Sequence, residues 1–313
     1  MLYGLNNNMA YLFNRTMGAS IGLEEPEPDG IIASLSRVAR KTCDVLKSEF
    51  HSLGIVPTVQ YGNESDFYYD DPDLLSCLVK EKESKDGGVI PTIHAASDVH
   101  PLNPSFPGLL ERILKLCDNF GCKNITVHLS LNKEDITRQT IECLTNEPVL
   151  DLINQYKVSI DLENNWHECW FGYSEHITRF YEELKDKLHE MGHEDLYDYY
   201  GMCFDCGHLF AQYTIAKRDV KEGIYDLFEN LGETIRTFHL HGNDGSGDEH
   251  LPFNRKKGKF EENQEILLEA LKILDIPSRE SEKRWNAVII TELGSPFTLE
   301  EFKEHSHLII GAL

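Results

Sequence analysis

The sequence lacks the hydrophobic segments that direct a chain into or across a membrane. None of its apolar runs approaches the roughly 18 residues that a membrane-spanning helix requires. Residues 1–10 also lack a basic stretch followed by an apolar core, which is the pattern of a secretory signal. We therefore expect a cytoplasmic protein without a membrane partner.

Positive charge is scarce. Lys and Arg together number 30 against 53 Asp and Glu, which gives a formal net charge of −23. Such a charge repels the phosphate backbone of nucleic acids and the anionic surface of membranes. The composition therefore argues against a general nucleic-acid-binding protein.

Paired cysteine motifs of the kind that build a zinc knuckle or a disulfide framework are also missing. The 8 cysteines are scattered through helix-like and strand-like stretches. Cys203 and Cys206 have CxxC spacing, but no second pair completes a zinc site. We expect reduced thiols that serve as small core residues.

Short β-branched or apolar runs alternate with longer helical patterns along the 313 residues. The short runs predict strands at 2–5, 55–61, 89–94, 125–129, 158–163, 201–205, 235–241 and 288–292. Helical spacing predicts helices at 31–50, 74–82, 109–116, 136–156, 177–191, 220–231, 266–274 and 299–310. Strict alternation of eight strands and eight helices is typical of a (β/α)8 TIM barrel. Because no linker or repeat divides the sequence, we expect residues 1–313 to form a single TIM-barrel domain.

Residues with nitrogen or oxygen ligand atoms end six consecutive predicted strands, where TIM barrels place their active sites. Asp248 and His250 follow the seventh of the eight predicted strands closely. The strand-end residues are His94, His128, Glu163, Asp205 with His208, His239 with His241, and Glu292. Burying so many carboxylates without a cation is costly, and these side chains bind zinc, manganese or magnesium. The sequence therefore predicts a divalent metal site.

Taken together, these motifs resemble those of the endonuclease IV and xylose isomerase-like TIM barrels. This superfamily includes AP endonuclease family 2 and the sugar phosphate isomerases and epimerases. The resemblance runs from about the third strand to the eighth. It implies one to three ions, Zn²⁺ or Mn²⁺, held by nine ligands: His94, His128, Glu163, Asp205, His208, His241, Asp248, His250 and Glu292. An acidic residue three positions after His241 favours it over His239, which we expect one layer deeper in the barrel.

The resemblance implies two kinds of reaction. The isomerases and epimerases need four ligands, which match Glu163, Asp205, His241 and Glu292 around one divalent ion. The metal polarises two substrate oxygens and stabilises an enediolate-like intermediate, while Glu163 and Glu292 act as the acid/base pair and His208 orients a substrate hydroxyl. We expect this reaction, on a small sugar or sugar phosphate.

The alternative is a zinc-dependent phosphodiesterase that resembles endonuclease IV and uses all nine ligands. The presence of His94, His128, Asp248 and His250 favours this alternative. The net charge argues against nucleic acid as its substrate, and so does the loop after His94, which lacks the bulky wedge that endonuclease IV inserts into a duplex. A third hypothesis is a barrel that binds a sugar or a metal without turnover.

Two loops offer groups for a small substrate. The loop after the fifth strand carries Trp166, Trp170 and Phe171, which either stack on a sugar ring or pack as a loop or subunit contact. A cationic run with Arg255 and Lys257 follows His250, where barrels often hold phosphate. A solvated loop is the alternative there. The sequence is compatible with a homo-oligomer but leaves the oligomeric state open.

Overall fold

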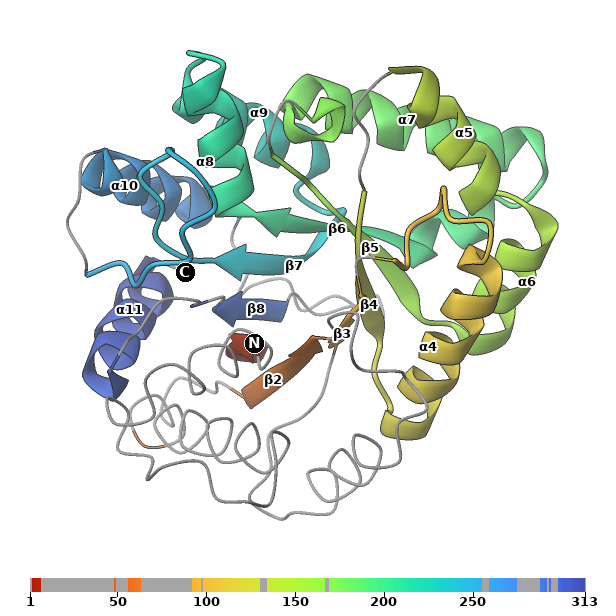
Figure 1. The fold of residues 1–313 in the computed structure, drawn as a ribbon, viewed down its shortest axis with the longest axis horizontal. Coiled ribbons are helices and arrows are strands. Elements are labelled where there is room, and N and C mark those ends of the chain that lie inside the picture. The colour runs from red at the N-terminus through yellow and green to blue at the C-terminus, as the bar shows by residue number, and fades with distance from the viewer. Residues whose placement is uncertain are drawn as a thin grey trace.

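Parallel strands close a barrel in the computed structural model (Figure 1). It describes residues 2–6, 48, 56–62, 92–96, 98–129, 134–166, 169–254, 259–274, 288–291, 293 and 298–312. The strands pair in chain order, and β8 returns to pair with β1. They are β1 (Leu2–Asn6), β2 (Val56–Gly62), β3 (Thr92–His94), β4 (Asn124–His128), β5 (Ser159–Glu163), β6 (Tyr200–Asp205), β7 (Ile235–Leu240) and β8 (Val288–Thr291). The predicted (β/α)8 TIM barrel is confirmed.

Helices lie outside the strands (Figure 1). The α-helices are α4 (Phe106–Phe120), α5 (Glu134–Leu144), α6 (Glu147–Tyr156), α7 (Ser174–Glu190), α8 (Cys206–Ile215), α9 (Val220–Leu231), α10 (Phe260–Leu271) and α11 (Leu299–Ala312). Short 3₁₀ helices are η2 (Trp170–Gly172), η3 (Glu194–Tyr199) and η4 (Lys272–Leu274). The helices predicted at 31–50 and 74–82 lie outside the described residues, apart from Ser48.

The prediction of one helix between successive strands is wrong in two places. The helix predicted at 136–156 is two helices, because Asn146 caps α6 by accepting a hydrogen bond from the Val149 amide and Pro148 lacks the N–H that a continuous helix needs. The helix α8 was not predicted. Most of its residues are buried, so it lacks the periodicity that marks an amphipathic helix.

A buried polar layer crosses the barrel two residues before Glu163. The Asp161 carboxylate accepts hydrogen bonds from Asn124 Nδ2 at 2.5 Å, Thr237 Oγ1 at 2.7 Å and Ser159 Oγ at 2.8 Å. A Cβ atom on Gly201 would collide with this carboxylate. The layer therefore ties β4, β5 and β7 together directly beneath the ends of the strands.

Two expectations from composition concern the thiols and the membrane. Within the described residues the cysteines are free thiols, and most of them are buried, which confirms the expected core role. No described helix has both the length and the apolar character needed to cross a bilayer.

Candidate metal centre

The ends of the strands bring eight of the nine predicted ligands together. His94, His128, Glu163 and Asp205 are the last residues of β3, β4, β5 and β6. His208 lies in the first turn of α8, His241 directly follows β7, and Asp248 and His250 lie in the loop beyond. Glu292 lies outside the described residues, directly after β8.

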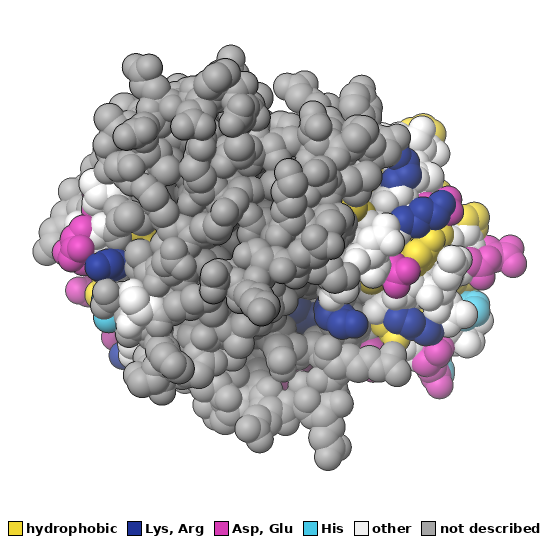
Figure 2. Space-filling model, turned by 90° about the horizontal axis from the view of Figure 1, so that it is seen from below, with side chains coloured by type: hydrophobic (Ala, Val, Ile, Leu, Met, Phe, Trp, Pro, Cys, Tyr) yellow, Lys and Arg dark blue, Asp and Glu magenta, His cyan; other side chains and the backbone are white. Residues whose placement is uncertain are grey.

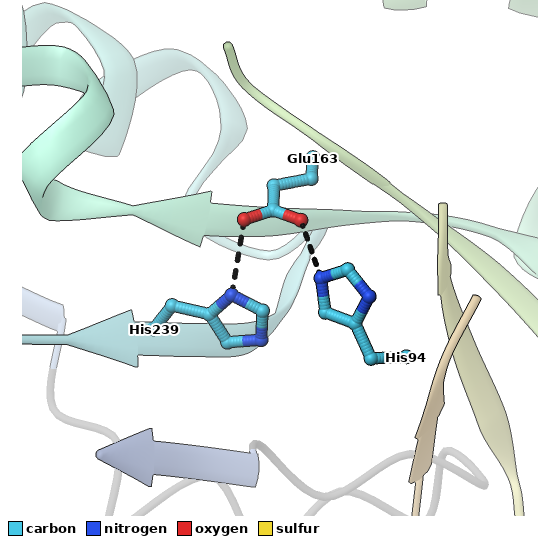
Figure 3. A group of neighbouring side chains, drawn as sticks. All are labelled: His94, Glu163 and His239. Atoms are coloured by element: carbon cyan, nitrogen blue, oxygen red, sulfur yellow. Dashed lines mark hydrogen bonds and ion pairs between the residues drawn. The ribbon is translucent and has the colours of Figure 1, made fainter. Parts of the chain in front are cut away.

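We name His94, His128, Glu163 and His239 the inner cluster. Its centre is the Glu163 carboxylate, whose side chain is 1% exposed. Glu163 Oε2 lies 3.2 Å from His94 Nε2 and 2.8 Å from His128 Nε2, while Oε1 lies 3.0 Å from His239 Nδ1. Figure 3 shows the carboxylate between the rings of His94 and His239. The His128 side chain is 33% exposed and is the most accessible member of the inner cluster.

We name His241, Asp248 and His250 the outer cluster. Asp248 Oδ1 lies 2.8 Å from His250 Nε2, and the rings of His241 and His250 stack with centroids 4.2 Å apart. One ligand atom from each residue lies within 4.8 Å of the others, as is also true of His94, Glu163 and His239. Both groups have the dimensions of a metal site.

Asp205 and His208 connect the two clusters. Asp205 Oδ1 caps α8 by accepting a hydrogen bond from the His208 amide at 2.7 Å. Its other oxygen, Oδ2, lies 3.3 Å from His241 Nε2 and 3.9 Å from His239 Nδ1. His208 Nε2 lies 3.5 Å from Asp248 Oδ2. The eight described ligands therefore form one continuous group.

The surrounding histidines keep the carboxylates ionised. Burial opposes the charge on Glu163, but His128 and His239 hold its pKa well below the usual range. Burial also opposes the charge on Asp205, yet His208 and His241 lower its pKa to about 2. Against its own burial, His208 has a pKa raised well above the usual value, chiefly by Asp205. The carboxylates are thus in the form that binds a cation at neutral pH.

Backbone carbonyls orient several of the rings. His94 Nδ1 lies 2.9 Å from the Ala95 carbonyl oxygen, and His208 Nδ1 lies 2.8 Å from that of Asn164. His241 Nδ1 makes a longer contact of 3.4 Å with the Gly242 carbonyl. A hydrogen bond of this kind places the proton on Nδ1 and leaves Nε2 as the ligand atom. Imidazole nitrogens and buried carboxylates therefore fit Zn²⁺, Mn²⁺ or Mg²⁺.

His239 lies deeper in the barrel than His241, because it pairs with Asp205 inside β7 whereas His241 follows that strand. Its imidazole nevertheless reaches the Glu163 carboxylate, which the sequence analysis did not predict. Strand alternation correctly indicates that His239 and His241 face the same side, but it does not say how far each one extends into the site.

Two supporting residues were missed by the sequence analysis. Asn164 clamps the end of β6, because its amide donates to the Asp205 carbonyl at 2.9 Å and accepts from the Asp205 amide at 2.8 Å. Gly207 leaves room for the His241 ring, with which a Cβ atom would collide. The only sequence signals are an Asn after a predicted ligand and a Gly between Asp205 and His208.

The predicted substrate contacts are only partly available. Phe171 is fully buried and packs against Phe180 at 5.1 Å between centroids, so its predicted stacking on a sugar is corrected to a core role. The Trp170 ring stacks on His176 at 4.7 Å and is 9% exposed. Trp166 is half-buried and lies beside Gly247 in the loop that carries Asp248.

The cationic run is not covered by the structure. Arg255 and Lys257 lie outside the described residues. Their assignment to a phosphate site therefore stays a prediction.

Comparison with known proteins agrees with this geometry. Residues 103–272, more than half of the chain, match the model of a family described as xylose isomerase-like TIM barrel. A search of curated proteins gives no match.

Solved structures with similar folds cover nearly the whole chain. A D-tagatose 3-epimerase-like protein superposes with a TM-score of 0.63 at 16% identity, covering 100% of this chain and 97% of that one. Endonuclease IV from Thermus thermophilus gives 0.53 at 16% identity, with 99% and 98% covered. A xylose isomerase-like TIM barrel protein from Mycobacterium smegmatis, solved in complex with magnesium, gives 0.55 at 13% identity, with 91% and 89% covered. At these identities the likeness shows the fold alone.

Proposed function

Because the chain belongs to the family of xylose isomerase-like TIM barrels, we propose that it is a divalent-metal-dependent isomerase or epimerase of a small sugar or sugar phosphate. The observation that carries this proposal is the buried Glu163 carboxylate, ionised and surrounded by three histidines at the carboxyl ends of the strands. Histidines are neutral when they bind a metal, so in that state a bound cation would offset the buried negative charge in their place.

A bound divalent cation would polarise two neighbouring substrate oxygens and so favour loss of a proton from the adjacent carbon. Glu163 and Asp205 on β5 and β6 would hold it, together with a histidine from β7. Glu292, which directly follows β8, is the proposed fourth ligand. A likeness to a protein solved with magnesium supports a divalent ion without identifying which one.

The remaining steps belong to side chains of the chain itself. Glu163 is ionised at neutral pH, so it is able to accept a proton from carbon, and Glu292 is proposed to return one. His208 Nε2 lies 3.5 Å from Asp248 Oδ2 and is proposed to orient a substrate hydroxyl. Trp166 is the aromatic residue that we propose beside the sugar ring, because Phe171 is buried in the core.

A phosphodiesterase is the second candidate, and the outer cluster favours it. A four-ligand isomerase does not require His241, Asp248 and His250 to converge as they do here. A second or third ion in that position would suit the clamping of phosphate oxygens. On the described part of the face in Figure 2, Lys and Arg side chains lie among Asp and Glu side chains.

Proton exchange at carbon tests the proposal. The protein, loaded with Mn²⁺, Mg²⁺ or Zn²⁺, is incubated in deuterated water with aldoses, ketoses and their phosphates, and deuterium at carbon is followed by NMR. Exchange that disappears in Glu163→Gln is the expected result. Absence of exchange with every sugar and metal would refute the isomerase. Cleavage of a duplex with an abasic site at physiological salt would favour the phosphodiesterase instead.

A further inference from the structure

The loop that follows β7 carries two of the proposed ligands, Asp248 and His250. We name residues 242–254 the ligand loop. Its two limbs pair at their base, where the Gly242 amide donates to the Leu251 carbonyl at 2.5 Å and the Leu251 amide donates to the Gly242 carbonyl at 2.9 Å. The two ligands therefore stand on a tip that is joined to the barrel through one base.

Side-chain amides make the tip of the ligand loop a compact unit. The buried Asn243 accepts a hydrogen bond from the Gly245 amide at 2.6 Å and donates one to the Gly247 carbonyl at 2.6 Å. Asn263 Nδ2, on α10, donates to the Asn243 carbonyl at 3.1 Å. Because the turn that leads to Asp248 is braced from within, a displacement of the base is passed on to the ligands.

The returning limb of the ligand loop is attached to α11. The Phe253 amide donates to His305 Nδ1 at 3.1 Å, and the two rings meet edge to face with centroids 4.5 Å apart. Asn254 Nδ2 donates to Glu304 Oε2 at 2.5 Å. Two successive residues of α11 thus hold two successive residues of the loop, and the Phe253–His305 pair is buried.

His305 accepts this hydrogen bond only while its Nδ1 carries no proton. Burial is the main cause that lowers the pKa of His305 to about 3, nearby His241 acts in the same direction, and the backbone of Leu240 opposes them. The ring is therefore neutral at neutral pH, with its proton on Nε2. These influences also place it close to the end of β7, so one buried ring lies beside both limbs of the ligand loop.

We propose that His305 is a positioning residue for the outer cluster: through Phe253 it fixes the base of the ligand loop, and so holds Asp248 and His250 where they bind a divalent cation. It acts through the hydrogen bond from the Phe253 amide and not as a ligand. This inference rests on the proposed metal dependence and extends it to a residue of α11 to which the sequence analysis gave no role.

Three variants of α11 test the proposal. His305→Leu removes the hydrogen-bond acceptor, and His305→Gln keeps one. Ser306→Ala is the matched control, because Ser306 is equally buried and its hydroxyl donates to the Phe302 carbonyl of the same helix. Each chelator-treated protein is titrated with Zn²⁺ by calorimetry and with Co²⁺ by visible absorption. Asp248→Asn shows which part of the titration belongs to the outer cluster, and NMR follows the exchange of the Phe253 amide in deuterated water.

We expect His305→Leu to weaken ion binding at the outer cluster about tenfold. This is the lower end of the roughly 10- to 100-fold that loss of a supporting partner costs, because His305 acts through the loop and not directly on a ligand. The Phe253 amide should exchange faster. His305→Gln should restore most of the affinity, and Ser306→Ala should keep that of the wild type. Rescue by Gln separates positioning from filling of the core, since Leu fills the core as well.

Unchanged affinity at the outer cluster in His305→Leu would overturn the inference and leave the proposed enzyme standing. An equal loss in Ser306→Ala would also overturn it, because the effect would then come from α11 as a whole. If the wild-type protein takes up no ion at all, the proposed function fails together with the inference.

A measurement on the wild-type chain covers the case in which His305→Leu does not fold. With histidine labelled by ¹⁵N, we expect His305 at neutral pH to show an unprotonated Nδ1 and a protonated Nε2, and the Phe253 amide to be protected from exchange. A protonated Nδ1 would show that His305 accepts no hydrogen bond from Phe253, and would overturn the inference.

Discussion

The inner and outer clusters use similar side chains but are built on different supports. The inner donors stand on β3, β4, β5 and β7, whose register is set by pairing with neighbouring strands. Asp248 and His250 stand on a loop that is held by local contacts, among them the bridge between Gly242 and Leu251. The Asp248 side chain is 25% exposed against 1% for Glu163. A geometry set by strands is more precise than one set by a loop, so the inner cluster suits chemistry that tolerates little displacement.

The largest effect is expected at the centre of the inner cluster. Glu163→Gln removes the charge that three histidines contact. We therefore expect loss of the ion bound at the inner cluster and a fall in turnover of at least about 1000-fold. Metal analysis and deuterium exchange measure both. Glu175→Gln, which breaks an exposed ion pair with Arg218, is the control and should change neither. Turnover retained by Glu163→Gln would contradict the proposed base.

Asp248→Asn perturbs the outer cluster and its contact with His208, which connects the two clusters. Asp248 contacts His250 and His208, and burial of its carboxylate is outweighed by those contacts, which lower its pKa. Loss of an outer-shell partner costs roughly 10- to 100-fold, so we expect loss of this direct ligand to lower the affinity for an ion at the outer cluster by at least about 100-fold, or about 2.7 kcal/mol. Sugar proton exchange should fall less than about tenfold. A fall as large as that of Glu163→Gln would indicate that both clusters take part in one reaction, as a phosphodiesterase requires.

Gly201→Ala tests the layer that supports the inner cluster from below. The added Cβ collides with the buried Asp161 carboxylate, so we expect a loss of about 2 kcal/mol in the free energy of unfolding. The affinity for an ion at the inner cluster should fall, while the affinity for an ion at the outer cluster is retained. Denaturant unfolding and metal titration measure these quantities. Gly108→Ala in α4, where a Cβ meets nothing within 4 Å, should instead raise stability slightly. Equal effects of both substitutions would argue against the collision.

The smallest effect concerns a histidine behind the outer cluster. His305 on α11 accepts a hydrogen bond from the Phe253 amide at 3.1 Å, and burial is the main cause that lowers its pKa to about 3. The unfolded chain binds a proton near pH 6.5, while the folded chain does not until about pH 3. The stability provided by neutral His305 is therefore complete above pH 6.5 and is lost as the pH falls toward 3.

Replacing His305 with Gln removes this titration while keeping a hydrogen-bond donor and acceptor. Between about pH 6.5 and 5 we expect the unfolding free energy of His305→Gln to fall less steeply than that of the wild type, by about 1.4 kcal/mol per pH unit. Urea unfolding at several pH values measures the difference. Parallel curves for the two proteins would show that His305 is protonated in the folded state.

The strands and the ligands at their ends were predictable because each is local in sequence. A short apolar run followed by His, Asp or Glu identifies both the strand and its position at the barrel mouth, as at His128 and Glu163. The break between α5 and α6 also had a local signal in Asn146 and Pro148, which the helical periodicity of the segment obscured.

Other features depend on packing and could not be predicted in this way. The contact of His239 with Glu163 joins β7 to β5, which are not neighbours in the barrel, and the register shifts between Met202 and Cys203 on the strand between them. Trp166, Trp170 and Phe171 share one loop, but their burial differs, and this difference depends on how the loop packs. Phe171 packs against the ring of Phe180 in the core, whereas Trp166 is half-buried.

The polar layer around Asp161 also determines when the metal site comes into being during folding. Asn124 Nδ2 and Thr237 Oγ1 lie 2.7 Å apart although 113 residues separate them in the chain. Contacts between such distant segments form late, because the intervening chain must first be ordered. Glu163 meets His94 and His239 from segments that are 69 and 76 residues away. A nascent or truncated chain therefore holds no preformed site, and ion capture reports that the barrel has closed.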